Sequence, residues 1–264
     1  MAQLTIANDE GELAHLVAER VTQLIERAVA THARALVALT GGQTPRRLYS
    51  NLADDRQPWR ARVPWPLVHL FWGDERHVPP DHPDSNYGMA KATLLDYVPI
   101  PADRIHRIRG EMRNAQDAAA DYERTLDVVS GFNRTADAVS GFSRTADVVS
   151  GFSRTFDVML LGLGEDAHVA SIFPDSELLA PGARERRVAA VWAAHLGAWR
   201  ITLTPHALLD AAAIVVLVAG PTKAAAVQAA LEAPPDVKTF PAQLLRAADD
   251  RVEWLLDRSA AALL

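Results

Sequence analysis

A histidine and an aspartate follow a glycine-rich turn in the second half of the sequence. His168 and Asp166 come directly after Gly162 to Gly164, and this turn follows the apolar run 156–161. A neutral imidazole can take a proton from water near pH 7, and a nearby carboxylate can orient it. The pair predicts a general base, while the alternative is a histidine with a purely structural role.

Two basic residues follow other apolar runs. Arg76 lies in the polar segment 73–87, behind the run 68–72, and Lys223 follows the run 214–219. A guanidinium offers a planar fork to a phosphate, and a lysine in the first turn of a helix adds charge where free N–H groups already attract anions. The alternatives are a polar loop that satisfies its own hydrogen bonds and an ordinary solvated lysine.

The segment 40–45 has the composition of a phosphate-binding turn. Gly41 and Gly42 let the backbone approach a ligand closely, the Thr44 hydroxyl can donate a hydrogen bond, and Pro45 suits the first turn of a helix. The GK[ST] ending of a Walker loop is missing. The alternative is a tight turn between a strand and a helix.

Three further charged residues could assist the chemistry. Asp74 and Glu75 precede Arg76 and could orient it, or a catalytic water. Glu75 is also the alternative to Asp166 as the carboxylate that holds the tautomer of His168 and stabilises its imidazolium. Arg200 begins another short strand, where it could reach the site and stabilise an oxyanion, or only cap the sheet.

Other site types lack support in the sequence. His77, Asp81 and His82 have the spacing of no standard metal-ligand set, so no metal site is predicted. The pattern Gly-x-Gly-x-x-Ala at 162–167 formally matches a dinucleotide fingerprint, but Pro174 comes too soon for the long helix that a fingerprint requires. No Gly-x-Ser-x-Gly elbow is present, which argues against a serine hydrolase.

An α/β sheet would bring these polar segments together. Residues 10–33 have the apolar spacing of an amphipathic helix, and longer helical patterns separate the short apolar runs 35–39, 68–72, 156–161, 188–192, 201–203, 214–219 and 252–256. Several runs are apolar on both faces, which is typical of buried parallel strands. We therefore expect a doubly wound, mostly parallel sheet flanked by helices, with the polar segments meeting at the carboxyl ends of the strands.

Composition narrows the class of protein. The 264 residues include no cysteine, which excludes disulfides, thiol nucleophiles and cysteine-bound metals. A net charge of −6 without long charged runs argues against nucleic-acid binding. The longest apolar stretch, 211–219, is far below the ~20 residues of a membrane span. We expect a soluble, cytoplasmic protein that is a monomer or a small homo-oligomer.

Residues 127–156 contain three copies of a ten-residue repeat. Ten residues do not return to the same face of a helix, and the Ser-Gly pair of each copy interrupts a strand. We expect an insertion at the surface of one α/β domain that spans residues 1–264. Binding of a partner by the repeat is the alternative.

Five segments in this order resemble the 6-phosphogluconolactonase family: TGGQTP (40–45), FWGDERHVPPDHPDSNYGMA (71–90), FDVMLLGLGEDAHVASIFP (156–174), RITLTPHALLDAA (200–212) and VAGPTKAAAV (218–227). The resemblance implies a fold like that of glucosamine-6-phosphate deaminase and ribose-5-phosphate isomerase. It also implies hydrolysis of 6-phospho-D-glucono-1,5-lactone to 6-phosphogluconate, in the oxidative pentose phosphate pathway and without an organic cofactor.

The resemblance assigns roles to four residues of this chain. His168 matches the histidine expected to activate water, and Asp166 matches the family aspartate; Arg76 and Lys223 match the basic residues associated with the sugar phosphate. The family commonly reads Gly-Pro-Asp-Gly-His-Thr here, whereas this chain has Glu165, Ala167 and Val169 in place of Pro, Gly and Thr. If position 167 has a positive φ, its methyl group is strained by about 1 kcal/mol.

Two other functions fit the same fold. Aminosugar-phosphate deaminases or isomerases typically carry a Phe-Asn-Glu segment after the histidine, whereas this chain reads Val-Ala-Ser-Ile-Phe at 169–173. A phosphosugar sensor without catalytic activity would explain the departures at residues 165 and 167. Such sensors generally carry a helix-turn-helix module, for which the ~30 residues before the first strand are too few.

Overall fold

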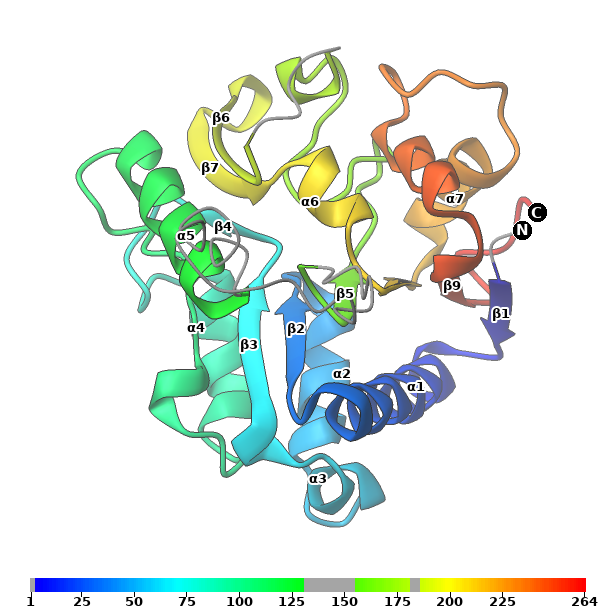
Figure 1. Ribbon diagram of the computed structural model, residues 1–264. Helices are drawn as coiled ribbons and strands as arrows, with labels where there is room; N and C mark the ends of the chain where they lie inside the picture. The colour runs from blue at the N-terminus through cyan, green and yellow to red at the C-terminus, as the bar shows by residue number, and fades with distance from the viewer. Residues whose placement is uncertain (1–2, 131–154, 181–185) are drawn as a thin grey trace, which may run out of the picture.

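A six-stranded parallel sheet forms the centre of the computed structural model, which describes residues 3–130, 155–180 and 186–264 (Figure 1). Its strand order is β1-β9-β8-β5-β2-β3, and every neighbouring pair is parallel. The strands are β1 (Gln3–Ala7), β2 (Ala35–Leu39), β3 (Val68–Trp72), β5 (Val158–Leu161), β8 (Ala213–Val218) and β9 (Val252–Asp257). The predicted doubly wound α/β class is confirmed.

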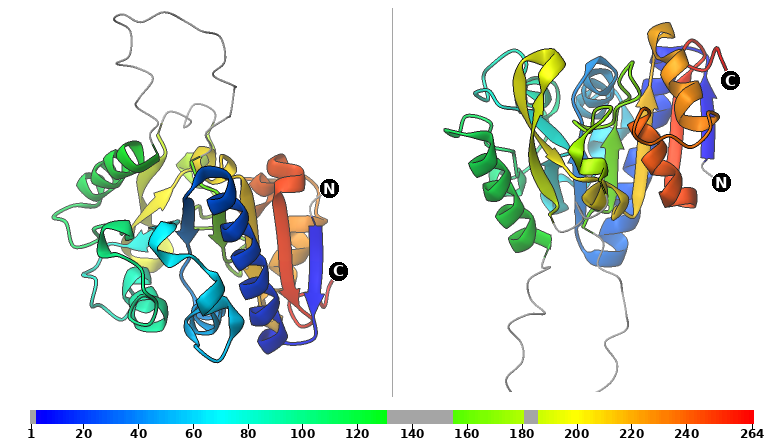
Figure 2. Two further views of the ribbon diagram at one scale, coloured as in Figure 1. Left: turned by 60° about the horizontal axis from the view of Figure 1, so that its bottom comes forward. Right: turned by 90° about the horizontal axis from the view of Figure 1, so that it is seen from above.

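Helices cover both faces of this sheet, which explains its continuous apolar strands. Figure 2 shows α1 (Glu10–His32) on one face, and α6 (Pro205–Leu209) and α7 (Ala224–Leu231) on the other. Helix α1 begins where the Asp9 side chain accepts a hydrogen bond from the Glu12 N–H. The other α-helices are α2 (Gln43–Ala53), α3 (Pro58–Arg62), α4 (Asn86–Ala90) and α5 (Ala115–Ser130).

Two buried tyrosines bind the backbone at the carboxyl ends of the neighbouring strands β2 and β3. The Tyr49 hydroxyl accepts from the Thr40 N–H at 2.9 Å and donates to the Thr40 carbonyl at 2.7 Å. The Tyr122 hydroxyl bridges the N–H and carbonyl of Trp72 in the same way, at 2.8 and 3.0 Å. The two tyrosine hydroxyls thus form hydrogen bonds with backbone N–H and carbonyl groups that the sheet leaves unpaired, at the points where the polar segments begin.

A second, antiparallel sheet packs beside the first. Its strands are β4 (Asp74–Arg76), β7 (Ala198–Leu203) and β6 (Val188–Ala193), in the order β4-β7-β6, and α5 contacts β6 and β7. A single residue, Gly73, separates β3 from β4, so the chain passes directly from the parallel sheet to the antiparallel one. Strand β4 was not predicted from the sequence, because its three polar residues carry no apolar pattern.

The expected insertion lies largely outside the described residues. Within the described part, residues 127–130 form the end of α5. The single-domain organisation therefore stays a prediction. No helix in the described ranges is long and apolar enough to span a membrane.

His69 of the edge strand β3 stacks against His106. Arg104 donates to His69 Nε2, so His69 must carry its proton on Nδ1, which lies 2.9 Å from His106 Nε2. The rings are nearly parallel, at 5.2 Å and 9°. Burial and the neighbouring charge of Arg104 lower the pKa of His69 to about 4, from 6.5 in the absence of these contacts.

This pair predicts a loss of stability in acid. The unfolded chain binds a proton at His69 below pH 6.5, whereas the folded chain does so only near pH 4. The free energy of unfolding should therefore fall by about 2 kcal/mol through His69 between pH 7 and pH 5. Urea unfolding at both pH values should show a smaller difference for His69→Gln than for the wild type; equal differences would contradict the prediction.

Candidate active site

The polar segments meet at one cavity of about 250 Å³ at the carboxyl ends of the parallel strands. Strands β8, β5, β2 and β3 are consecutive in the sheet, and each contributes the segment that follows it. The lining residues are Thr40, Gly41, Gly42, Asp74, Arg76, Asn86, Gly162, Leu163, Gly164, His168, Ala170 and Lys223. The expected convergence of distant sequence segments is therefore present in the structure.

A larger cavity, of about 570 Å³, is lined by Arg46, Tyr87, Lys91 and Arg107 among others. It includes neither His168 nor the glycine-rich turns. We place the candidate active site in the smaller cavity, because it lies at the carboxyl ends of the parallel strands and brings both glycine-rich turns together with His168, Arg76 and Lys223.

His168 is oriented by Asp166. His168 Nδ1 lies 2.5 Å from Asp166 Oδ1. An ionised carboxylate can only accept a hydrogen bond, so the ring proton of His168 is on Nδ1. The lone pair of Nε2 is then free to accept a proton from water. Burial opposes the charge on Asp166, but the hydrogen bond and charge of His168 outweigh this and lower the pKa of Asp166 to about 2. Asp166 is therefore ionised at neutral pH.

Gly164 leaves the space that this pair occupies. A Cβ atom at Gly164 would lie 2.0 Å from His168 Nδ1 and 2.5 Å from Asp166 Oδ1. The turn is closed by backbone hydrogen bonds from the Gly164 N–H to the His168 carbonyl at 2.9 Å and from the Ala167 N–H to the Gly164 carbonyl at 3.1 Å. The glycine thus brings the turn against the imidazole.

Ala167 has a left-handed backbone, with φ 61°. The positive φ on which the expected strain at residue 167 depended is therefore present. The left-handed region costs an alanine about 1 kcal/mol more than a glycine.

Ala167→Gly should therefore raise the free energy of unfolding by about 0.5–1 kcal/mol, because relief of strain outweighs the extra freedom of the unfolded chain. Ala225→Gly is the matched control: this exposed alanine lies within α7, where glycine should destabilise by a similar amount. Urea unfolding of both variants measures the two shifts. A loss of stability in Ala167→Gly would refute the prediction.

Arg76 and Lys223 enter the cavity from different elements. Arg76 lies on β4, and its Nη1 donates to the Asp84 carbonyl at 2.5 Å. Its Nε is buried without a hydrogen-bond partner among the described residues. A ligand oxygen in the cavity would satisfy a donor of this kind. Lys223 ends the short 3₁₀ turn Pro221–Lys223 that follows β8.

Two residues absent from the sequence-based site fix Asp74. The Asn86 amide donates to Asp74 Oδ1 at 3.2 Å, and the Ser171 hydroxyl donates to Asp74 Oδ2 at 2.6 Å. A Cβ at Gly41 would lie 1.9 Å from Asn86 Oδ1, so the glycine-rich turn makes room for this amide. The available signal was Asn86 itself, an amide within the polar segment that carries Arg76.

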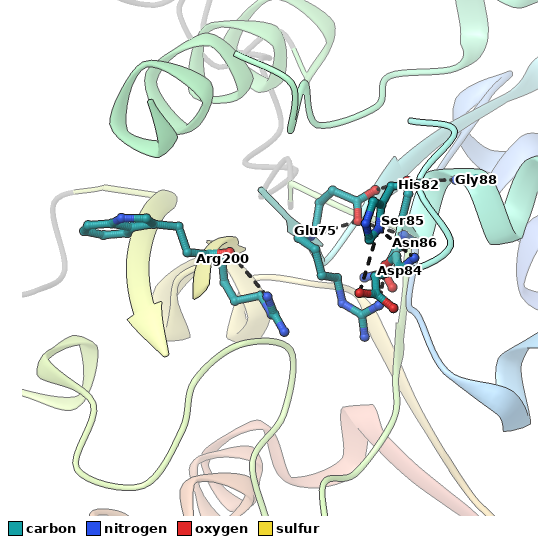
Figure 3. Close-up of polar contacts among 9 residues, drawn as sticks. Glu75, His82, Asp84, Ser85, Asn86, Gly88 and Arg200 are labelled. Atoms are coloured by element: carbon teal, nitrogen blue, oxygen red, sulfur yellow. Dashed lines mark hydrogen bonds and ion pairs between the residues drawn. The ribbon is translucent and has the colours of Figure 1, made fainter. Parts of the chain in front are cut away.

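The prediction that Glu75 takes part in the chemistry of the site requires a correction. Its carboxylate accepts from the backbone N–H groups of Arg76 and Asn86 at 2.8 and 2.7 Å and from the Ser85 hydroxyl at 3.1 Å (Figure 3). It also accepts from the Tyr87 N–H at 2.8 Å. Burial raises the pKa of Glu75, although these hydrogen bonds oppose the shift. Glu75 does not line the cavity and shapes the loop after β4, because neighbouring residues of a strand point to opposite faces.

Arg200 and Thr44 also lie outside the cavity lining. Arg200 is directly opposite Arg76 in the β4–β7 ladder and donates to the Trp199 carbonyl at 3.4 Å (Figure 3). Burial and the charge of Arg76 lower the pKa of Arg200. Thr44 lies in the first turn of α2.

Comparisons with known proteins agree with this architecture. The family described as glucosamine-6-phosphate isomerases/6-phosphogluconolactonase matches residues 8–254. A protein named 6-phosphogluconolactonase from a Nostoc species is 35% identical over 238 residues, which cover 90% of this chain and 88% of the relative. The solved 6-phosphogluconolactonase from Trypanosoma brucei has a TM-score of 0.78 and 26% identity, covering 100% of this chain and 99% of the other.

A solved monomeric glucosamine-6-phosphate deaminase also has a TM-score of 0.78, at 20% identity over 99% of this chain and 100% of the other. Its similarity concerns the fold alone. The architecture is therefore shared by proteins with different reactions, and the choice between them depends on the site.

Proposed function

Because the chain belongs to the glucosamine-6-phosphate isomerase/6-phosphogluconolactonase family, we propose that it hydrolyses 6-phospho-D-glucono-1,5-lactone to 6-phosphogluconate, in the oxidative pentose phosphate pathway. The observation that supports this most is the cavity in which the imidazole held by Asp166 lies together with Arg76 and Lys223. A general base and two cations suit a substrate that is both an ester and a phosphate.

His168 acts as the general base. Its neutral Nε2 takes a proton from water as the water oxygen attacks C1 of the lactone. The tetrahedral intermediate then collapses, the bond from C1 to the ring oxygen breaks, and the imidazolium returns the proton to that oxygen. Asp166 stabilises the imidazolium while it carries the charge. A δ-lactone is an activated ester, so this route needs neither a covalent intermediate nor an organic cofactor.

The phosphate is held apart from the reacting carbon. Arg76, Lys223 and the turn of Gly41 and Gly42 bind it, and this remote binding positions C1 near His168. The oxyanion is stabilised by backbone N–H groups of the segment 162–164. The Gly164 N–H already donates to the His168 carbonyl, so the earlier part of this segment is the better donor.

A time course of 6-phosphogluconolactone disappearance tests the proposed function, with buffer alone as the reference for spontaneous hydrolysis. The wild type should accelerate the loss of lactone well above buffer. Ammonia release from glucosamine 6-phosphate would instead identify a deaminase, and tight binding without turnover would identify a sensor. We place the reaction in the cytoplasm, in a monomer or a small homo-oligomer.

Arg76→Ala and Lys223→Ala should each raise KM for the phosphorylated lactone by about 10- to 100-fold, because each removes a charge-assisted contact to the phosphate. KM for D-glucono-1,5-lactone should change little. Lys238→Ala, which removes an exposed lysine paired with Asp175, is the matched control. Equal losses toward both lactones would argue against a phosphate role for these residues.

A further inference from the structure

We infer that Glu165 determines how tightly this site binds phosphorylated ligands, because its carboxylate competes with the phosphate for Lys223. The inference rests on the proposed function and assigns a role to a residue at which this chain departs from the common family pattern. Where the family commonly has an uncharged proline, this chain places a carboxylate between Gly164 and Asp166.

The geometry pairs Glu165 with one of the two cations of the cavity. Glu165 Oε1 lies 4.0 Å from Lys223 Nζ, and in the described part of the chain Lys223 has no other carboxylate within ion-pair distance. Arg76, the second cation, is held by the neutral Asp84 carbonyl instead. Among the described residues, Arg76 therefore has no ion pair that a phosphate must break, whereas Lys223 has one with Glu165.

The difference in burial indicates how the competition proceeds. The Lys223 side chain is 26% exposed, whereas that of Glu165 is 64% exposed. Glu165 can therefore swing into solvent without disturbing the imidazole pair, while Lys223 stays at the cavity. A phosphate that binds Lys223 must displace the carboxylate, and the two anions repel each other at close range.

The expected size of the effect follows from the exposure of the pair. Exposed ion pairs shift an equilibrium by about 1.4- to 5-fold, and salt weakens them. Removing the Glu165 charge should thus tighten the binding of phosphorylated ligands by about 2- to 5-fold at low ionic strength. Ligands without a phosphate do not need Lys223 and should bind unchanged.

Titration calorimetry with three probes tests this: 6-phosphogluconate, gluconate and inorganic phosphate. The proteins are the wild type, Glu165→Gln and Glu177→Gln. Glu177 is also an exposed glutamate but is not the ion-pair partner of Lys223, so its variant has the same net charge without the local change. Each titration is made at low and at high salt.

We expect Glu165→Gln alone to bind 6-phosphogluconate and phosphate more tightly, with the gain shrinking at high salt and gluconate unaffected. Equal affinities for the phosphorylated probes in wild type and Glu165→Gln, or the same gain in Glu177→Gln, would overturn the inference. If the wild type bound phosphate but not 6-phosphogluconate, the proposed function would fail, while the phosphate titrations would still decide the role of Glu165. A wild type that bound neither would refute both.

Discussion

Replacing His168 by alanine should lower kcat for the phosphorylated lactone by about 10²- to 10⁴-fold while KM changes little. Among the described residues that line the cavity, only His168 combines a free lone pair with a carboxylate that stabilises its protonated form. Its removal leaves water without an acceptor for its proton at the moment of attack. Arg76 and Lys223, the proposed phosphate-binding cations, belong to other elements of the fold and stay in place.

The measurement is the enzymatic rate after subtraction of spontaneous hydrolysis. His206→Ala is a matched control, since this exposed histidine lies on α6 and does not line the cavity. Asp166→Asn should give an intermediate loss of kcat, because the imidazole remains but its tautomer is no longer held. Near-wild-type turnover in His168→Ala would end the assignment of a general base.

Gly164→Ala should lower kcat by about 10²-fold, although it adds a single methyl group. That methyl carbon would lie 2.0 Å from His168 Nδ1, so the imidazole must move. A displacement of about 1 Å can reduce a rate by about this factor. Gly164 is not among the glycines with positive φ, so its backbone accepts an alanine and the effect arises from the collision alone.

Gly162→Ala provides the control for this prediction. It also adds a methyl group to the turn after β5, but its nearest atom would be the Gly41 carbonyl oxygen at 3.9 Å, an ordinary contact. The KM for the phosphorylated lactone should stay near the wild-type value in both variants. If Gly162→Ala and Gly164→Ala lost activity equally, the collision with the imidazole would not be the cause.

Much of the fold could be predicted because strands that are buried on both faces of the sheet consist of continuous runs of apolar residues. Strands β3 and β8 have such runs, and they occupy the expected positions. Strand β1 does not, since four of its five residues are exposed at the edge of the sheet. Strand β4 is polar and exists through its pairing with β7, more than a hundred residues later in the chain.

The types of side chain that form the site could also be predicted from the sequence, but the residues to which they hydrogen-bond could not. From the sequence, the neighbours Asp74 and Glu75 were both candidates for the site. In the structure, the pleat of β4 turns Asp74 toward the cavity and Glu75 toward its own loop. Asn86 and Ser171 were missed because their contacts with Asp74 join segments far apart in the chain.

The sequence by itself determined the parallel sheet, the polar segments that follow its strands, and the proximity of His168 to Asp166, because apolar patterns and local spacing are properties of the chain. The tertiary structure alone decided which charges share the cavity, which carboxylate holds the imidazole, and that Glu165 reaches Lys223. The order of the strands and the direction of each side chain decide these contacts, and both depend on packing between distant segments.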